Sequence, residues 1–323
     1  MKKTEYFKLF SHNIAVKGKD KSAIYNVQRS DIKFIPNSLY GVLEKMEIQS
    51  IIDIRKEIPG EEYIIFDSYI NFLIKNNFGF LTTDPEEYPK MPMDWRTPNI
   101  INTAVIEYDF NNSNYELSEV FKQLDDLLCP HLEIRLKVKN IAEVKYISEL
   151  TRGLVFRSIG LIVEYFNEVE ETIDELFTKN EKFDYIIIHN SPKPGIHSKQ
   201  FENRINYIAE DIYEGLQEKH FPQDNYIVSV KYFTEAQDHH TYYNKRVCID
   251  WNGNIKNCLL HKKDFGNITD TKLKELIENS EFTELWSVNP SRIIDYKDDE
   301  LRYCKFYTQE LERVDDYYYK VAQ

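Results

Sequence analysis

The first 98 residues alternate polar and apolar positions in short pieces, which predicts a small domain of strands followed by helices. Residues 6–36 alternate with period two around a turn near Gly18, as short strands do. The stretches that follow predict a helix over 37–46, a short apolar run over 48–54 and a second helix over 61–77. An extended aromatic wing is expected over 78–88. Asn37 or Ser38 is expected to cap the first helix. The connector 91–99 holds two prolines and ends this unit near Pro98.

A second pattern, of apolar runs alternating with amphipathic segments, covers residues 99–236. Strands are expected over 101–110, 131–136, 158–166, 183–190 and 225–233. Helices are expected over 116–128, 141–153 and 169–178, with 198–219 helical or irregular. Strand–helix repeats about 30 residues long indicate right-handed βαβ units and a parallel sheet. A closed barrel takes about 250 residues, so this α/β segment predicts an incomplete parallel (β/α) barrel or an open sheet.

The remaining segment, 237–323, begins with a hairpin. The runs RVCID and NIKNCLL flank Asn252-Gly253, a turn dipeptide that suits the twist of paired strands. Apolar positions in 271–288 recur near helical spacing and predict an amphipathic helix. The tail ERVDDYYYKVAQ predicts a frayed helix or a docking tail.

Composition narrows the function classes. The 323 residues carry a formal net charge of −13, which argues against nonspecific nucleic-acid binding. No apolar run approaches a membrane span, and no Gly-rich phosphate loop is visible. Four unevenly spaced cysteines and no recognisable signal peptide predict a cytoplasmic location.

The hairpin region also carries a family resemblance. Its motifs are the step from Gly253 to Cys258, then FGNI, then EFTELW. Together they are similar to the C-terminal SPASM domain of peptide-modifying radical SAM proteins. The sequence motif YYNKR-x-x-ID-x-x-G-x-IKN most resembles that of the SPASM-type peptide maturases of grasp-with-spasm systems. Those maturases work beside an ATP-grasp ligase and a short ribosomal precursor peptide.

The resemblance implies a role for each segment. Residues 1–98 would form a winged helix-turn-helix-like leader-recognition domain, 99–236 a radical SAM-like partial barrel, and 237–323 a SPASM-like domain. In such a leader-recognition module an extended peptide adds to the edge of a small sheet. The matching region here is an expected edge strand and a helix, and the peptide-binding residues predicted from it are Ala23, Tyr25, Val27, Arg29 and Tyr69. The implied partners are the precursor peptide and the ATP-grasp ligase.

The sequence departs from the radical SAM pattern at its cysteines. A radical SAM enzyme holds its cluster with C-x-x-x-C-x-x-C after the first barrel strand, and the segment NNSNYELSEV contains no cysteine. The tail YKDDELRYC offers one thiol, whereas an iron–sulfur cluster takes about four thiolates. An iron–sulfur cluster is therefore doubtful, and no cofactor is expected. A structural zinc site is the alternative, with Cys248, Cys258, His261 and Cys304 as ligands. The competing interpretation is that these cysteines are small buried residues.

Other polar residues are weaker catalytic candidates. His239, His240, Glu235 and Asp238 follow the last expected strand, and His189 ends another, where barrel ligand sites form. Glu107 and Asp109 could act as paired carboxylates in acid–base work. For each group the alternative is an ordinary solvated or hydrogen-bonded surface. The basic stretch 135–157 is likewise expected to be a solvated face.

Three functions remain open from sequence. The first is a maturation protein, a pseudoenzyme or adaptor relative to radical SAM enzymes, that binds the precursor peptide and acts with an ATP-grasp ligase. The second is a metal-dependent enzyme that uses the Cys/His set or the His/Asp/Glu rim. The third is a structural or regulatory scaffold.

Overall fold

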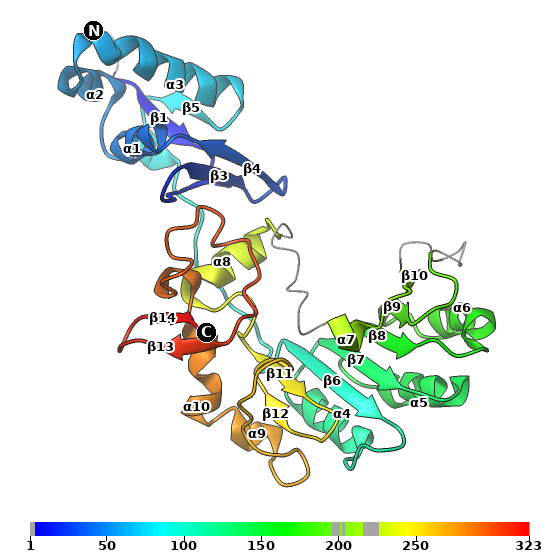
Figure 1. Cartoon of the computed structure of the whole chain (residues 1–323). Helices are drawn as coiled ribbons and strands as arrows, with labels where there is room; N and C mark the ends of the chain where they lie inside the picture. The colour runs from blue at the N-terminus through cyan, green and yellow to red at the C-terminus, as the bar shows by residue number, and fades with distance from the viewer. Residues whose placement is uncertain (1–3, 196–200, 202–203, 216–225, 323) are drawn as a thin grey trace. The chain divides into compact units, whose positions relative to one another are not determined.

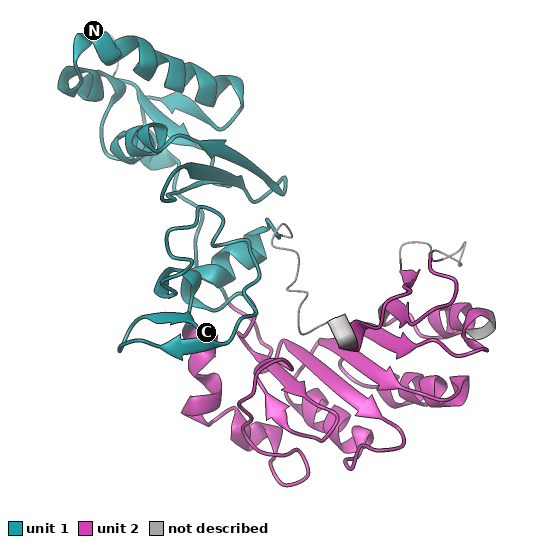
Figure 2. Cartoon of the chain, viewed as in Figure 1, with its two compact units in different colours: residues 1–95, 223–241, 288–323 teal, residues 96–222, 242–287 magenta. Residues whose placement is uncertain are grey.

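The computed structural model of the chain describes residues 4–195, 201, 204–215 and 226–322. Contacts divide the chain into two compact units, each built from separate segments (Figure 2). Unit 1 comprises Met1–Trp95, Gln223–Thr241 and Val288–Gln323, and unit 2 comprises Arg96–Pro222 and Tyr242–Ser287. Among the described residues, no helix has the length and apolar character needed to cross a membrane.

Unit 1 begins with two small antiparallel sheets (Figure 1). The first pairs β1 (Tyr6–Leu9) with β5 (Gly79–Thr82). The second has the order β2-β3-β4, and its strands are Asn13–Val16, Ser22–Asn26 and Asp31–Ile35. The period-two pattern of the sequence therefore predicted the strands of this region correctly.

Three helices follow these strands, and they are α1 (Asn37–Met46), α2 (Ile51–Glu57) and α3 (Tyr63–Lys75), with short 3-10 turns η1 (Gly60–Glu62) and η2 (Pro85–Glu87). The predicted cap of α1 is wrong, because the N-cap position is Pro36 and no side chain caps it. The Asn37 amide instead donates to the carbonyl oxygens of Gly18 and Lys19. Leu39, Met46 and other apolar residues of the helices bury a local core with Phe7.

The rest of unit 1 contains α8 (Val230–Asp238), η4 (Pro290–Arg292) and the hairpin β13 (Leu311–Arg313) with β14 (Tyr319–Val321). Two predictions are corrected here. The segment expected as the strand 225–233 is helical from Val230 onwards, and Asn225 lies outside the described residues. The tail forms a β-hairpin and not a frayed helix.

Unit 2 is built on a seven-stranded, mostly parallel sheet with the order β10-β9-β8-β7-β6-β11-β12. Its strands are β6 (Thr103–Asp109), β7 (His131–Lys137), β8 (Ser158–Glu164), β9 (Phe183–His189), β10 (Ile205–Tyr207), β11 (Arg246–Ile249) and β12 (Ile255–Lys256). Only the β11–β12 pairing is antiparallel. The α/β class and the parallel sheet are as predicted.

Helices connect the parallel strands and cover one face of this sheet (Figure 1). They are α4 (Leu117–Asp126), α5 (Ile141–Thr151) and α6 (Val169–Lys179), close to the predicted ranges, and a short helix α7 spans Ile212–Gly215. Alternate strand residues such as Ile134 and Leu161 pack against Phe121 and Ile147 of the helices in one large core. The predicted segment 198–219 lies partly outside the described residues and includes β10 and α7.

The hairpin β11–β12 joins the sheet beside β6. Val247 and Cys248 pair in parallel register with Ala104 and Val105, so the hairpin supplies the strand beside β6. Gly253 has φ +82° at the turn, a conformation that favours glycine. The single helix predicted over 271–288 is wrong. It is broken into α9 (Leu273–Leu276), α10 (Ser280–Thr283) and η3 (Glu284–Ser287).

Candidate functional site

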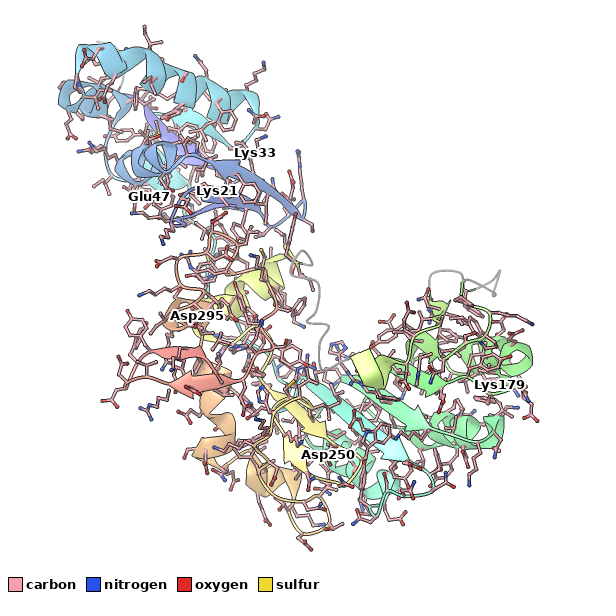
Figure 3. All side chains as sticks on the ribbon, viewed as in Figure 1. Lys21, Lys33, Glu47, Lys179, Asp250 and Asp295 are labelled. Carbon is pink, nitrogen blue, oxygen red and sulfur yellow. The ribbon has the colours of Figure 1, made fainter. Side chains whose placement is uncertain are left out.

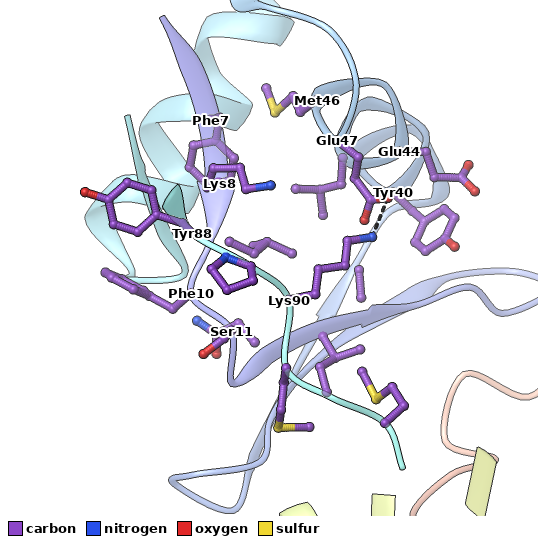
Figure 4. Close-up of a pocket in the computed structure, with 18 residues that line it drawn as sticks. Phe7, Lys8, Phe10, Ser11, Tyr40, Glu44, Met46, Glu47, Tyr88 and Lys90 are labelled. Carbon is purple, nitrogen blue, oxygen red and sulfur yellow. Dashed lines mark ion pairs between the residues drawn. The ribbon is translucent and has the colours of Figure 1, made fainter. Parts of the chain in front are cut away.

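An apolar pocket lies in the N-terminal part of unit 1, between β1, the start of β2 and α1 (Figure 4). It has a volume of about 210 Å³, and the segment from Tyr88 to Met93 borders it. Its apolar lining residues come from β1, β2, α1 and the segment 88–93. They include Phe7, Leu9, Ile14, Ala15, Leu43, Met46, Met91 and Met93. The pocket is therefore a concave apolar site, the kind of surface that takes a ligand side chain.

One edge of β1 faces this pocket. The Phe10 N–H donates to the Phe78 carbonyl, and the antiparallel register continues this pairing through Lys8 to Tyr6. Because backbone groups alternate in direction along a strand, the N–H and C=O groups of Phe7 and Leu9 point away from β5. In the two-stranded sheet, β5 is the only strand paired with β1 among the described residues. The pocket is thus bordered by an unpaired strand edge.

Charged groups line the rim of the pocket. Lys90 forms an ion pair with Glu47 at 2.6 Å, and both side chains are more than half exposed. Burial and a hydrogen bond to Glu44 raise the pKa of Tyr40. Lys8 lines the same pocket, and among the described residues it has no ion-pair partner. One rim carboxylate, Glu47, is therefore charge-paired, whereas Glu44 is hydrogen-bonded to a neutral hydroxyl and Lys8 has no ion pair within the described part of the chain.

The peptide-binding residues predicted on an edge strand lie elsewhere. Ala23 and Tyr25 belong to β3, which is the central strand of its sheet and pairs with β2 and β4. Ala23, Tyr25 and Val27 are all buried. The Tyr25 hydroxyl donates to the Glu300 carbonyl at 2.7 Å. The prediction of an edge strand is corrected, because a central strand has no free backbone groups for another strand.

The other two predicted peptide-binding residues are more accessible. Arg29 is exposed in the turn after β3, and its N–H donates to the Asn26 side chain. The Tyr69 hydroxyl lies 2.7 Å from the Ser38 hydroxyl, linking α3 to α1. Tyr69 also packs against the local core. Neither residue lines the pocket described above.

The four candidate metal ligands do not all belong to one unit. Cys248, Cys258 and His261 are in unit 2, whereas Cys304 is in unit 1. His261 is buried, and its Nε2 lies 2.9 Å from the Tyr243 hydroxyl. A turn separates Cys258 from His261, because strand β12 ends at Lys256 and the His261 N–H donates to the Cys258 carbonyl.

All four cysteines are buried and each thiol donates a hydrogen bond. Cys248 donates to the Asn257 carbonyl, Cys258 to the Tyr242 hydroxyl and Cys304 to the Leu301 carbonyl. Burial raises the pKa of each of these thiols, and that of Cys304 reaches about 12. No group of three or more His, Cys, Asp and Glu side chains suited to a metal ion occurs in the part of the chain that the structure describes. The described donor set therefore does not fit a thiolate-held cluster.

The His, Asp and Glu candidates near residue 239 lie at the end of helix α8 and not at the rim of the sheet. His239 is the C-cap of α8, its N–H donates to the Glu235 carbonyl, and its ring meets Trp95 edge-on at 5.1 Å. His240 is fully buried. These residues belong to unit 1, whereas His189 belongs to unit 2. The expected location of these residues at a barrel strand end is therefore wrong.

His189 does lie at the carboxyl end of β9, as predicted. It is 1% exposed, and its Nδ1 lies 3.6 Å from a carboxylate oxygen of Asp211. Its ring meets Tyr213 edge-on at 4.8 Å. Burial lowers the pKa of His189, so the neutral imidazole is favoured.

The face of the parallel sheet opposite the helices carries a charged network. Arg135 binds Glu133 at 2.8 Å and lies 3.8 Å from Glu107, and the Tyr185 hydroxyl donates to Glu133 at 2.9 Å. A Cβ added at Gly160 would lie 2.2 Å from the Tyr185 ring, so this residue makes room for the ring. Parallel sheets usually bury two apolar faces, so this polar face is unusual. Arg135 was expected on a solvated surface, but its side chain is only 12% exposed.

Within this network, burial raises the pKa of Glu107 to about 7, although Arg135 opposes the shift. Burial also acts on Asp109, but hydrogen bonds from Asn112 and Asn111 outweigh it and lower the pKa of Asp109. The two carboxylates predicted as a pair therefore have different protonation near neutral pH. Asp250, labelled in Figure 3, forms a further ion pair with Lys256 at 3.3 Å.

Comparisons with known proteins bear on the C-terminal part of the chain. Residues 242–305 match the family model of the SPASM domain, described as an iron–sulfur cluster-binding domain. This range contains the hairpin, the FGNI turn and Cys304, which belong to the segment that carries the resemblance. The SPASM part of the resemblance is therefore confirmed for this segment.

Two solved structures show weak similarity. Both are of SuiB from Streptococcus suis, one bound to S-adenosylmethionine and one bound to the precursor peptide SuiA. Each is 11% identical to this sequence, with TM-scores of 0.28 and 0.27. The similarity covers 86% of this chain and 89% or 90% of the SuiB chain. These values are too low to assign a fold or a function. No curated protein matches this sequence.

The prediction that no cofactor is expected is corrected by the family match. A segment of the chain is similar to a domain whose description is iron–sulfur cluster binding, whereas the sequence prediction had doubted the cluster because of the missing cysteines. The described thiols do not supply the expected ligand set, so the family match and the donor set disagree.

Sequence reasoning missed the residues of the apolar pocket. Phe7, Leu43 and Met46 were assigned to strands and helices, but their common site depends on how β1 packs against α1. A signal was present in the tyrosine, proline and methionines of 88–93, which follow no periodic pattern and border the pocket.

Proposed function

We propose that this chain is a maturation protein for a ribosomally synthesised peptide, similar to the SPASM maturases of grasp-with-spasm systems. It binds the precursor peptide through its N-terminal region and acts with an ATP-grasp ligase. Support comes from the SPASM match over 242–305 and from the motif YYNKR-x-x-ID-x-x-G-x-IKN, which resembles that family of maturases. In this proposal residues 1–98 are the winged-helix-like leader-recognition domain, 99–236 a partial barrel and 237–323 the SPASM-like domain.

The observation that carries the peptide-binding role is the unpaired edge of β1 beside the apolar pocket. An extended peptide can add to this edge with backbone hydrogen bonds, while its side chains enter the pocket. The edge is that of β1 and not the β3 segment expected from sequence. Both components of strand addition, free backbone groups and a side-chain pocket, therefore occur at one place.

The proposal assigns the bond-forming chemistry to the ligase. The 323 residues contain no C-x-x-x-C-x-x-C motif, the arrangement that holds the cluster which cleaves S-adenosylmethionine. The role of this chain would then be to bind the precursor and present it to the ligase.

A binding titration tests the proposal. The short precursor peptide expected beside the gene would be labelled and titrated with the full chain, with fluorescence anisotropy as the readout. Ala15→Phe adds a large side chain to the pocket lining and should weaken binding at least about tenfold, or roughly 1.4 kcal/mol. Ala142→Phe makes the same change at an exposed position in unit 2 and should leave binding unaltered.

Circular dichroism and unfolding midpoints would check that Ala15→Phe remains folded. A wild-type chain that does not bind the precursor would exclude the proposal. Equal affinity of the wild type and a folded Ala15→Phe chain would exclude the pocket as the binding site.

A further inference from the structure

We infer that the segment recognised at β1 is an extended peptide in which a bulky apolar residue stands directly beside an acidic residue. This inference rests on the proposed function and specifies its substrate. The apolar side chain would enter the pocket against α1, and the carboxylate would pair with Lys8. This pairing of an apolar and an acidic residue follows from the pocket, the strand edge and the rim charges.

The pocket is large enough for a whole apolar side chain. Its volume is about 210 Å³, whereas an engineered cavity of about 150 Å³ binds benzene. Leu43 and Met46 of α1 form its buried wall, with exposed fractions of 5% and 2%. An uncharged side chain of the size of leucine or phenylalanine would therefore be favoured there, since a polar group would lose its water without a partner.

Lys8, at the rim, favours an acidic neighbour. Glu47 is paired with Lys90, and Glu44 has a hydrogen bond with the neutral hydroxyl of Tyr40, so each carboxylate already has a contact within the chain. Lys8 is partly buried and has no ion-pair partner among the described residues. A carboxylate beside it would gain a charge-assisted contact in a partly dry setting.

The geometry of a strand makes the two residues neighbours in sequence. Phe7 packs into the core of the region, and the adjacent Lys8, at the rim of the pocket, leaves β1 on the other side of the strand. A peptide strand paired with β1 alternates its own side chains between the same two faces. The residue that faces α1 and the residue that faces Lys8 therefore occupy consecutive positions.

A peptide series tests this pattern. Overlapping 12-residue segments of the precursor would be titrated with the full chain, and the tightest segment would then be varied. Replacing its bulky apolar residue with serine, or the adjacent acidic residue with its amide, should each weaken binding about tenfold. The same replacements at a position two residues outside the pair should have no effect.

A charge exchange separates a direct contact from a structural role. Lys8→Glu should weaken binding of the acidic peptide about tenfold, and a peptide with lysine at the acidic position should recover it. Lys33→Glu makes the same charge change on the exposed strand β4, outside the pocket lining, and serves as the matched control. Figure 3 labels Lys33 on this strand.

The outcomes distinguish the two levels of the proposal. If no segment of the precursor binds, the proposed function fails. If a segment binds but tolerates the serine and amide replacements, the proposed function stands and this inference is overturned. Recovery by the lysine peptide supports the Lys8 contact, whereas equal losses with Lys8→Glu and Lys33→Glu overturn it. Self-association that rises with protein concentration and blocks peptide binding would assign the edge to a second copy of the chain.

Discussion

Glu107 carries the clearest electrostatic conflict among single residues. The residue is 8% exposed on the polar face of the sheet, with Arg135 at 3.8 Å from its carboxylate. Burial penalises the charged form more than Arg135 stabilises it, so its pKa rises to about 7. The environment of Asp109, two residues later, has the opposite effect because hydrogen bonds hold its charge. Two carboxylates on one strand therefore differ in protonation through their local contacts alone.

A pH dependence of stability follows for Glu107. The unfolded chain releases this proton near pH 4.5 and the folded chain near 7, so stability should fall as pH rises between these values. Glu107→Gln cannot ionise and should show a flatter profile. At pH 8 it should be more stable than the wild type by on the order of 1–3 kcal/mol. Urea unfolding at pH 5 and pH 8 would measure the difference.

Glu278→Gln, at an exposed position of unit 2, is the control for this experiment and should follow the wild-type profile. A stability difference between Glu107→Gln and the wild type that is the same at both pH values would contradict the raised pKa.

Among the elements, α8 shows how a helix can occupy a segment that reads as a strand. A strand was predicted over 225–233, yet the apolar residues Tyr226, Ile227 and Val230 are all more than 40% exposed. The buried residues of α8 are Phe233, Thr234 and Ala236, and the two apolar ones are three positions apart, the spacing of one helical face. The Ser229 side chain accepts a hydrogen bond from the Tyr232 N–H and so begins the helix.

The cap of α8 can be tested directly. Ser229→Ala removes the acceptor for the Tyr232 N–H and should lower stability by about 1 kcal/mol. Ser229→Asp keeps an acceptor at the same position and should stay close to the wild type. Denaturant unfolding of the three proteins would give these values, and equal losses for both variants would show that the cap is not the cause.

Local patterns predicted the elements whose partners are close in sequence. Helices α4, α5 and α6 appear nearly as expected, because their apolar stripes pack on strands directly before and after them. The strand β11 was predicted, but its place beside β6 was not, because Val247 pairs with Ala104 far away in sequence. The helix over 271–288 failed because apolar spacing alone does not reveal the breaks, where new caps such as Asn279 begin.

The candidate site was harder to predict than the elements. The edge strand was assigned to 23–29, because the sequence could not show that β3 lies between β2 and β4. The pocket depends on the packing of β1 against α1 and on the course of 88–93, which are long-range features. The cysteine pattern correctly pointed to a SPASM domain, but it led to the wrong expectation about the cofactor.

At the scale of the whole molecule, unit 1 has two separate apolar clusters. The first is local and draws all its buried residues from between Phe7 and Phe78. The second joins Tyr25 and its neighbours to Phe233 and Cys304. The Phe233 ring meets Tyr25 at 5.1 Å and Tyr303 at 5.4 Å. Distant parts of the chain are therefore required for the second cluster only.

Phe233→Ala should destabilise this second cluster by about 3–5 kcal/mol, because the cavity removes both ring contacts. Hydrogen exchange measured by mass spectrometry should show lost protection in β3 and α8. Protection of β6 to β9 in unit 2 should be retained, since the large core of that unit contains no residue of the cluster. A uniform loss of protection across both units would contradict this expectation.

The composition of the second cluster sets an order of events during synthesis. The local cluster is complete in sequence once Phe78 has emerged from the ribosome, and β5 and the pocket segment 88–93 follow soon after. The paired strand β1, the helices and the pocket can therefore form early. Tyr25 and Val27 must wait for Cys304, which is made more than two hundred residues later. At typical translation rates this delay is on the order of 10–40 s. A nascent chain would therefore expose part of β3 for most of its synthesis, while the edge of β1 is already formed.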